Sequence, residues 1–258
     1  MGEILEKLAV LCRPGISSGE IDEQAEKMII KAGGRPAFKG YKTSVADRPF
    51  PATICASFNE EIVHGIPRKD RVLKDGDIFS IDIGMCWPEN SRRFIKSIKS
   101  KVKGVFSDTA VTVVIGEVSE KIQKLVDVTQ QSLEEGIKVA QPGNSVAAIG
   151  RAVETYVQSQ GKYGIVRDLV GHGVGHKVHE DPHSPNYYDP ALESVILRPG
   201  MVIAIEPMIS LGGWQVETMG DGWTIRMKDK SSCAHFEHTI IITEQGNIVA
   251  TRRPSESV

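Results

Sequence analysis

The chain has 258 residues, of which 40% are apolar and 25% are charged, as in a globular domain rather than a disordered chain. Its 31 Lys and Arg residues nearly balance 33 Asp and Glu residues, for a formal net charge of -2. This balance excludes a strongly basic tail that would bind nucleic acid.

The apolar stretches are too short to cross a membrane. The longest, such as residues 201–205 and 239–242, have the length of strands, whereas a spanning helix needs about 20 apolar residues. The first twelve residues lack the basic start and small-residue cleavage site of a secretory signal. We therefore expect a cytoplasmic protein without membrane contact. The cysteines form no CxxC pair and are expected to be free thiols: Cys12, Cys55, Cys86 and Cys233.

Two helices are predicted at equivalent places in the two halves of the chain. The first follows Pro-Gly-Ile-Ser at residues 14–17 and has apolar residues at helical spacing from Ile21 to Ile29. The second follows Pro-Gly-Asn-Ser at residues 142–145, with the same spacing from Ile149 to Val157. The two motifs are 128 residues apart, which indicates an internal repeat.

Two strand motifs that contain carboxylates repeat in the same order. A turn and an apolar strand lead to Asp82, and the same pattern leads to Glu206, 124 residues later. Asp108 precedes a β-rich run, as Glu237 does at an offset of 129. No linker divides the chain, so we expect one domain over residues 1–258, with halves of about 1–125 and 126–258. The predicted fold class is α+β, with an antiparallel sheet of pseudo-twofold symmetry covered by helices.

These four carboxylates lie in or beside apolar strand patterns, where an ionised group is costly to bury without a partner. A pseudo-twofold axis would bring them together, and two divalent cations would balance their charge. A nitrogen ligand is available in the Gly-rich run 171–176, where glycines flank His172 and let the backbone approach a ligand closely. The sequence therefore predicts a carboxylate-rich site for two metals, a type of site that can hydrolyse an amide.

A competing zinc motif occurs at residues 179–183, which match the HExxH pattern of zinc peptidases. That motif requires both histidines on one helical face. Pro182 disfavours a helix there, because it removes a backbone donor and restricts Asp181. We therefore reject this interpretation.

The order of the motifs resembles that of a type I methionine aminopeptidase of the pita-bread (creatinase/aminopeptidase) fold, over nearly the whole chain. The matching segments are PAFKGY at 36–41, CASFNEEIVHGIP at 55–67, DGDIFSIDIGM at 75–85, SDTAVTV at 107–113, GHGVGHKVHEDP at 171–182, PGMVIAIEPM at 199–208 and the stretch 223–239. The resemblance implies removal of the initiator methionine from nascent polypeptides, with a small second residue preferred.

The resemblance also implies a metal ligand set. Asp82 would hold one ion, Asp108 and Glu237 would bridge both, and His172 and Glu206 would complete the second site. The two divalent ions would be Co, Mn, Fe or Zn. The sequence does not select among these elements, because carboxylate-rich sites bind several divalent ions.

Three further roles follow from the same resemblance. Glu206 would shuttle a proton, and His179 would donate a hydrogen bond to the developing oxyanion. His64 would contact the substrate amide and orient the peptide. The side chain of the substrate methionine would lie in an apolar pocket lined by Phe38, Tyr41, Phe50, Cys55 and Trp223. Packing in the hydrophobic core would also explain any one of these residues.

The chain departs from the family pattern at two insertions. Asp82 and Asp108 are 26 residues apart, where the family has about eleven, and the extra segment 86–103 is basic. A solvated loop is the simpler interpretation of residues 88–103, and contact with ribosomal RNA is the alternative. The second insertion, at residues 42–49, lies near the predicted methionine pocket.

Two alternative functions remain. A pita-bread peptidase that acts at Xaa-Pro bonds usually carries a large additional N-terminal domain. A catalytically inactive peptide-binding module typically lacks metal ligands, whereas all five are present in this chain. A single domain also predicts a monomer.

Overall fold

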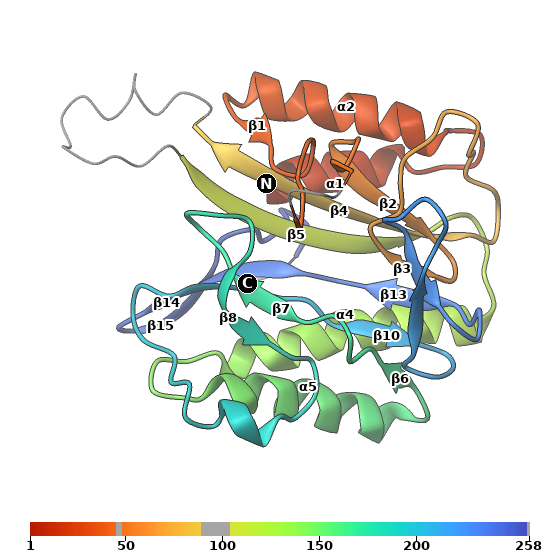
Figure 1. The fold of residues 1–258 in the computed structure, drawn as a ribbon. Helices are drawn as coiled ribbons and strands as arrows, with labels where there is room; N and C mark the ends of the chain where they lie inside the picture. Colours follow the sequence, from red (N-terminus) through yellow and green to blue (C-terminus); the bar gives the residue numbers. More distant parts are fainter. Residues whose placement is uncertain (45–47, 89–103, 257–258) are drawn as a thin grey trace.

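The structure is a computed structural model that describes residues 1–44, 48–88 and 104–256. Viewed as in Figure 1, two pairs of helices lie above and below a central group of strands. The helices are α1 (Gly2–Leu11), α2 (Ser18–Lys31), α4 (Glu120–Val139), α5 (Val146–Gln160) and the short 3-10 helix η1 (Pro190–Leu192). None of the helices in these ranges is both long and apolar enough to cross a membrane.

Serine caps explain where the two predicted helices begin. The side chain of Ser17 accepts a hydrogen bond from the backbone of Glu20, and the Glu20 carboxylate accepts one from the backbone of Ser17. Ser145 caps α5 in the same way, through the backbone of Ala148. Both helices therefore start at the serine of the repeated Pro-Gly-x-Ser motif, as predicted.

All strand pairings among the described residues are antiparallel. In the N-terminal half, β4 (Ile78–Trp87) pairs with β5 (Val105–Val114) on one side and with β1 (Arg35–Pro36) and β2 (Ile54–Phe58) on the other. The largest sheet of the C-terminal half has the order β15 (Gly246–Val249), β14 (His238–Thr243), β9 (Val202–Ile205), β7 (Gly171–Gly173) and β8 (Glu180–Ser184).

Two small sheets complete the strand layer. One has the order β13 (Cys233–His235), β10 (Met208–Ser210) and β6 (Gly164–Ile165). The other has the order β11 (Val216–Thr218), β12 (Ile225–Met227) and β3 (Glu61–Val63).

The sheets of the two halves join at Ala110 and Glu237. The backbone N–H of Glu237 donates to the carbonyl of Ala110 at 3.0 Å, and the reverse bond measures 3.3 Å. Two residues further along each strand, the hydroxyl of Thr239 donates to the carbonyl of Asp108 and accepts from its N–H. This join places two of the predicted metal ligands side by side.

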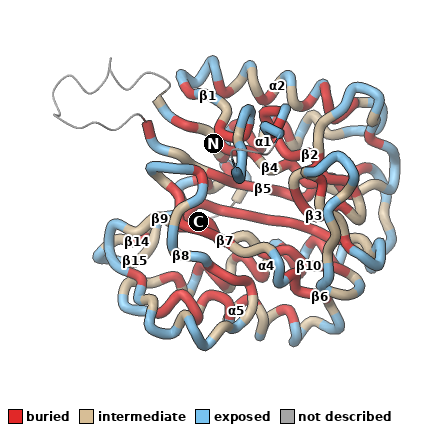
Figure 2. The backbone as a smooth tube through the Cα atoms, viewed as in Figure 1, coloured by how far each residue is buried: buried red, intermediate tan, exposed pale blue. Residues whose placement is uncertain are grey.

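The hydrophobic core lies between the helices and the strands. In Figure 2 the central strands are drawn mostly in red, the colour of buried residues. Helix α2 buries Ile21, Ala25 and Ile29, and helix α5 buries Ile149 and Val153, all of which belong to the same cluster. The apolar spacing read from the sequence therefore marks the faces that pack on the sheets.

Residues 180–184 form a strand, not a helix. Because a strand rises about 3.3 Å per residue, the backbones of His179 and His183 lie roughly 13 Å apart along the chain. The HExxH pattern therefore does not form the helical pair of zinc ligands that a zincin needs, in agreement with the restriction expected from Pro182.

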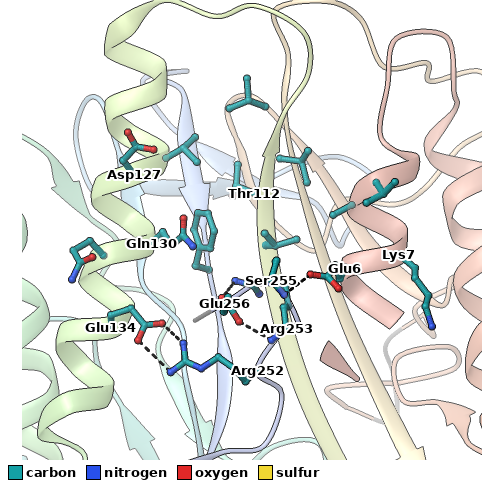
Figure 3. Close-up of a pocket in the computed structure, with 18 of the residues that line it drawn as sticks. Glu6, Lys7, Thr112, Asp127, Gln130, Glu134, Arg252, Arg253, Ser255 and Glu256 are labelled. Atoms are coloured by element: carbon teal, nitrogen blue, oxygen red, sulfur yellow. Dashed lines mark hydrogen bonds and ion pairs between the residues drawn. The ribbon is translucent and has the colours of Figure 1, made fainter. Parts of the chain in front are cut away.

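The C-terminal segment crosses a groove of about 1300 Å³ between α1 and α4, as Figure 3 shows. Arg252 pairs with Glu134 on α4, and the backbone N–H of Ser255 donates to Glu6 on α1 at 2.7 Å. Between them, the buried Arg253 side chain pairs with Glu256. The segment thus ties helices from both halves of the molecule together.

We expect Glu256→Gln to destabilise the protein by about 3 kcal/mol at pH 7, because it leaves the buried Arg253 without its counter-charge. Burial alone would raise the pKa of Glu256, but the hydrogen bond with His238 and the Arg253 charge lower it to about 2. Because the folded-state pKa is lowered, ionised Glu256 contributes its full stabilisation at pH values above about 4.5, its ordinary pKa. That contribution is lost as the pH falls from about 4.5 toward 2. The difference in the free energy of unfolding between Glu256→Gln and wild type should therefore decrease as the pH falls from about 4.5 toward 2.

Urea unfolding at a series of pH values measures this difference. Glu3→Gln on α1 is the matched control, because its ion pair with Lys7 is exposed and contributes little. Equal stability of Glu256→Gln and wild type at pH 7 would refute the assigned role of the segment.

Candidate metal centre

The five predicted metal ligands come from elements of both halves of the molecule. Asp82 lies in β4 and Asp108 in β5, where the register pairs Asp82 with Ala110. Glu237 lies between β13 and β14, and Glu206 directly follows β9. His172 is the central residue of β7, between two glycines without space for side chains: a Cβ on Gly173 would lie 2.2 Å from the carbonyl oxygen of Asp181.

Their side chains converge. Ligand atoms of Asp108, His172 and Glu237 all lie within 4.8 Å of one another, and Nε2 of His172 lies 3.5 Å from Oε1 of Glu206. Nδ1 of His172 is 2.9 Å from the carbonyl oxygen of Gly173. Since a carbonyl only accepts, Nδ1 carries the proton and Nε2 keeps a lone pair that faces the carboxylates.

The carboxylates lie in an environment that disfavours their charge. Burial raises the pKa of Asp82, Glu206 and Glu237 well above the ordinary values, and repulsion from Asp108 raises it further. Burial also raises the pKa of Asp108, against the opposing effect of His172. Cations between these groups would offset both the cost of burying charge and the repulsion between the carboxylates.

Two buried carboxylate oxygens have no hydrogen-bond partner in the described ranges: Oδ1 of Asp82 and Oε1 of Glu237. A buried oxygen of this kind is costly unless something else satisfies it. Together with the lone pair of His172, these oxygens form a set of hard and borderline donors. The residues present therefore fit divalent metal ions.

A cavity of about 330 Å³ opens onto this cluster, and every site residue predicted from the sequence lines it. The rings of Phe50 and Trp223 meet edge to face at 5.3 Å. Apolar side chains that the sequence did not indicate complete the wall: Val63, Leu169, Val170 and Met208. The cavity thus combines a polar, acidic floor with an apolar side. The predicted residues that line it are Phe38, Tyr41, Phe50, Cys55, His64, Asp82, Asp108, His172, His179, Glu206, Trp223 and Glu237.

His64 has a strained backbone. Its φ of 57° lies in the left-handed region, which non-glycine residues seldom adopt and which often marks a functional residue. Its ring lies edge to face against Trp223 at 6.3 Å. Burial lowers the pKa of His64 to about 4, so the imidazole is neutral near pH 7.

His179 lies beside the metal cluster, with its ring 4.4 Å from that of His172. Desolvation and the neighbouring histidines lower its pKa to about 3, so it too is neutral near pH 7. Nδ1 of His179 is 2.7 Å from the hydroxyl oxygen of Tyr41. When that hydroxyl donates to Nδ1, Nε2 carries the proton and is available as a donor.

Sequence reasoning gave no role to three polar residues near the site. Asp168 and His183 line the cavity. His235 lies behind it, with Nε2 3.7 Å from Oε2 of Glu206. No local signal marked His235, because its place beside Glu206 depends on the pairing of β13 with β10.

Comparisons with known proteins agree with this geometry. The model of metallopeptidase family M24 matches residues 1–92 and 94–244. Methionine aminopeptidase 1 of Bacillus subtilis is 45% identical over 247 residues, which cover 96% of this chain and 90% of that protein. A methionine aminopeptidase structure from Thermotoga maritima superposes with a TM-score of 0.85 at 39% identity, covering 97% of this chain and 91% of that one.

A more distant structure shares the fold alone. The Xaa-Pro dipeptidase of Bacillus anthracis has a TM-score of 0.67 at 21% identity, and the match covers 99% of this chain but only 58% of the dipeptidase. The pita-bread fold predicted from the sequence is thereby confirmed.

Proposed function

The chain belongs to metallopeptidase family M24, and on that basis we propose that it is a methionine aminopeptidase, which removes the N-terminal methionine from peptides and nascent proteins. The observation that supports this most strongly is the cluster of carboxylates and His172 at the floor of a half-apolar cavity. The preferred substrates have a small second residue.

Five side chains would hold the metal: Asp82 on one ion, Asp108 and Glu237 shared between two, and His172 with Glu206 on the second. The unpartnered oxygens of Asp82 and Glu237 support this set. Bound divalent ions polarise a carbonyl and lower the pKa of water, which is the chemistry that amide hydrolysis requires.

Side chains of the protein would bind and orient the substrate and move the proton. Nε2–H of the neutral His179 donates to the substrate oxygen as negative charge develops on it. Glu206 moves the proton toward the leaving amine. His64 contacts the substrate amide and orients the peptide. The apolar side of the cavity, with Phe50 and Trp223, excludes water from the methionine side chain.

The two alternative functions receive less support. The match to the Xaa-Pro dipeptidase is far lower in identity than the matches to methionine aminopeptidases, and the chain covers only 58% of its length. A non-catalytic binding module would not need the complete ligand set that this chain has.

The deciding experiment is release of free Met from Met-Ala-Ser by metal-stripped protein, titrated separately with Mn, Co, Fe and Zn. Ala-Pro-Ser is the control substrate. Metal-dependent release of Met without release of Ala is the expected result. Cleavage of Ala-Pro-Ser alone would support the Xaa-Pro activity, and metal binding without any cleavage would support the binding module.

Tyr41→Phe should lower kcat about tenfold with a smaller change in KM, because Nδ1 of His179 loses the hydroxyl that holds its tautomer. His179→Ala should lower kcat by about 10² to 10³ through loss of the donor itself. Tyr156→Phe on α5 is the matched control and should leave both constants unchanged. Steady-state kinetics on Met-Ala-Ser measure these effects, and an unchanged kcat in Tyr41→Phe would refute the role of the hydroxyl.

Several expectations from the sequence remain proposals. They are the two ions per chain, a monomer formed by a single domain over residues 1–258, and a cytoplasmic location. The predicted ribosome contact through residues 88–103 lies, except for Pro88, outside the described residues, as does part of the insertion at 42–49. A salt-sensitive ribosome pelleting assay with a variant that lacks residues 88–102 tests the ribosome contact, and unchanged pelleting would refute it.

A further inference from the structure

His235 is a buried polar residue without a partner. Its side chain is 2% exposed, and neither ring nitrogen has a hydrogen bond to any described residue. An imidazole always carries at least one N–H donor. A buried donor that stays unsatisfied is unfavourable, so such a group in a folded protein calls for an explanation.

The backbone around His235 holds the ring in place. Its N–H donates to the hydroxyl of Thr112 at 2.8 Å, and that hydroxyl donates to the carbonyl of His235 at 2.9 Å. On the other side, His235 pairs with Met208 in the antiparallel ladder of β13 and β10. Because Met208 is only two residues after Glu206, this register brings the ring to the Glu206 side chain.

The Glu206 carboxylate lies between two imidazoles. Oε1 is 3.5 Å from Nε2 of His172, and Oε2 is 3.7 Å from Nε2 of His235. A carboxylate that binds a metal through one oxygen has lone pairs on the other oxygen that need a donor. His235 offers that donor from the side away from the cavity, since it is not among the residues that line it.

The 3.7 Å between Nε2 of His235 and Oε2 of Glu206 exceeds the length of a hydrogen bond. We propose that His235 is a positioning residue for the metal centre: once Glu206 binds the metal, Nε2–H comes within hydrogen-bonding distance of Oε2, donates to it and thereby holds Oε1 toward His172 and the metal. This inference rests on the proposed function, because it takes Glu206 as a metal ligand. It assigns to residue 235 a role that requires a donor at one ring position, Nε2, and not merely a side chain of suitable size.

Three substitutions separate these requirements. In His235→Gln, the amide nitrogen reaches the place of Nε2. In His235→Asn, the shorter amide reaches only the place of Nδ1. His235→Leu fills the space without a donor. His176→Leu is the control, because His176 is exposed and not a proposed ligand.

The test is calorimetric titration of metal-stripped protein with Co²⁺, together with kcat and KM on Met-Ala-Ser. We expect His235→Leu and His235→Asn to bind Co²⁺ about 10- to 100-fold more weakly than wild type and to lose kcat more than KM. His235→Gln should stay within about threefold of wild type, as should His176→Leu.

The outcomes distinguish this inference from the proposed function. Wild-type affinity in His235→Leu, or equal affinities in the Asn and Gln variants, would overturn the role of His235 alone. If His235→Leu does not fold, the contrast between the Asn and Gln variants still decides the question. Wild-type protein that neither binds Co²⁺ nor releases Met would instead overturn the metal centre itself.

Discussion

Asp108→Asn is expected to lower kcat/KM for Met-Ala-Ser by at least about 10³-fold, equivalent to about 4 kcal/mol of lost transition-state stabilisation. Asp108 is placed to serve both ions, because its ligand atom lies within 4.8 Å of those of His172 and Glu237. An amide cannot supply the negative charge that a shared ligand needs. Glu237→Gln should have the same effect for the same reason.

The same substitution should stabilise the metal-free protein. Burial raises the pKa of the Asp108 carboxyl, so the ionised group opposes folding at neutral pH when no cation is bound. Asn keeps the acceptor for the backbone N–H of Thr109 and removes the charge. A merely disruptive substitution would lower both activity and stability, so opposite changes in the two are diagnostic.

Kinetics and thermal unfolding of metal-free protein together measure this prediction. Asp127→Asn on α4 is the matched control, since the Asp127 carboxylate accepts an exposed hydrogen bond from Gln123 and lies outside the 330 Å³ cavity. Cys233→Ala should also leave activity nearly unchanged. An Asp108→Asn enzyme with wild-type activity would contradict the assignment of Asp108 as a shared ligand.

Metal removal should make stability strongly dependent on pH. Burial raises the folded-state pKa of Asp82, Glu206 and Glu237 above their ordinary values of 3.8 to 4.5. Between those values and the raised ones, the folded state binds more protons than the unfolded state, so stability falls as the pH rises. The buried carboxylates should therefore add stability to the metal-free protein, relative to the metal-loaded protein, as the pH is lowered from 7 toward 5. His64, His179 and His235 contribute in the opposite direction over this range, because their lowered pKa values leave the folded state with fewer protons than the unfolded state. The histidine contribution is common to both forms, so it cancels in the difference between them.

Bound metal should remove this dependence and raise the melting temperature. Ligand at 100 times its Kd adds about 2.7 kcal/mol for one site, which corresponds to about 5–10 °C for a chain of this length. Melting curves with Mn²⁺ and with a chelator, between pH 5 and 8, measure both effects. This range avoids the contribution of Glu256, which changes below about pH 4.5, and the quantity to compare is the difference between the two curves at each pH, in which the contribution of the histidines cancels. Identical curves with and without metal would argue against the centre.

Glu237→Gln is a useful comparison for this second experiment. It removes one of the buried carboxylates, so it should reduce the pH dependence of the metal-free protein and also the stabilisation by Mn²⁺. A variant that lost neither would show that the charge of Glu237 does not contribute to the centre.

Much of the fold was predictable because its signals are local. The Pro-Gly-x-Ser motifs at 14–17 and 142–145 predict the starts of α2 and α5, since a serine cap acts over only three residues. The apolar spacing from Ile21 to Ile29 predicts which face of α2 is buried. The HExxH pattern was correctly set aside on similar grounds, because a proline restricts the residue before it.

The family resemblance predicted more of the candidate site than local sequence signals could. It named twelve residues, and the structure brings all of them to one cavity. Their roles remain proposals, because a shared cavity establishes proximity and not chemistry. His235 was passed over, since a histidine two residues before a ligand differs from an ordinary strand residue only in its tertiary neighbours.

The sequence by itself therefore determined the family, the fold, the starts of α2 and α5 and the set of candidate site residues. Only the tertiary structure decided that the two halves join through Asp108 and Thr239, that His235 faces Glu206, and that residues 252–256 tie α1 to α4. The reason is physical: caps and apolar periodicity act between residues a few positions apart. Contacts between residues separated by more than a hundred positions depend on how whole sheets and helices pack.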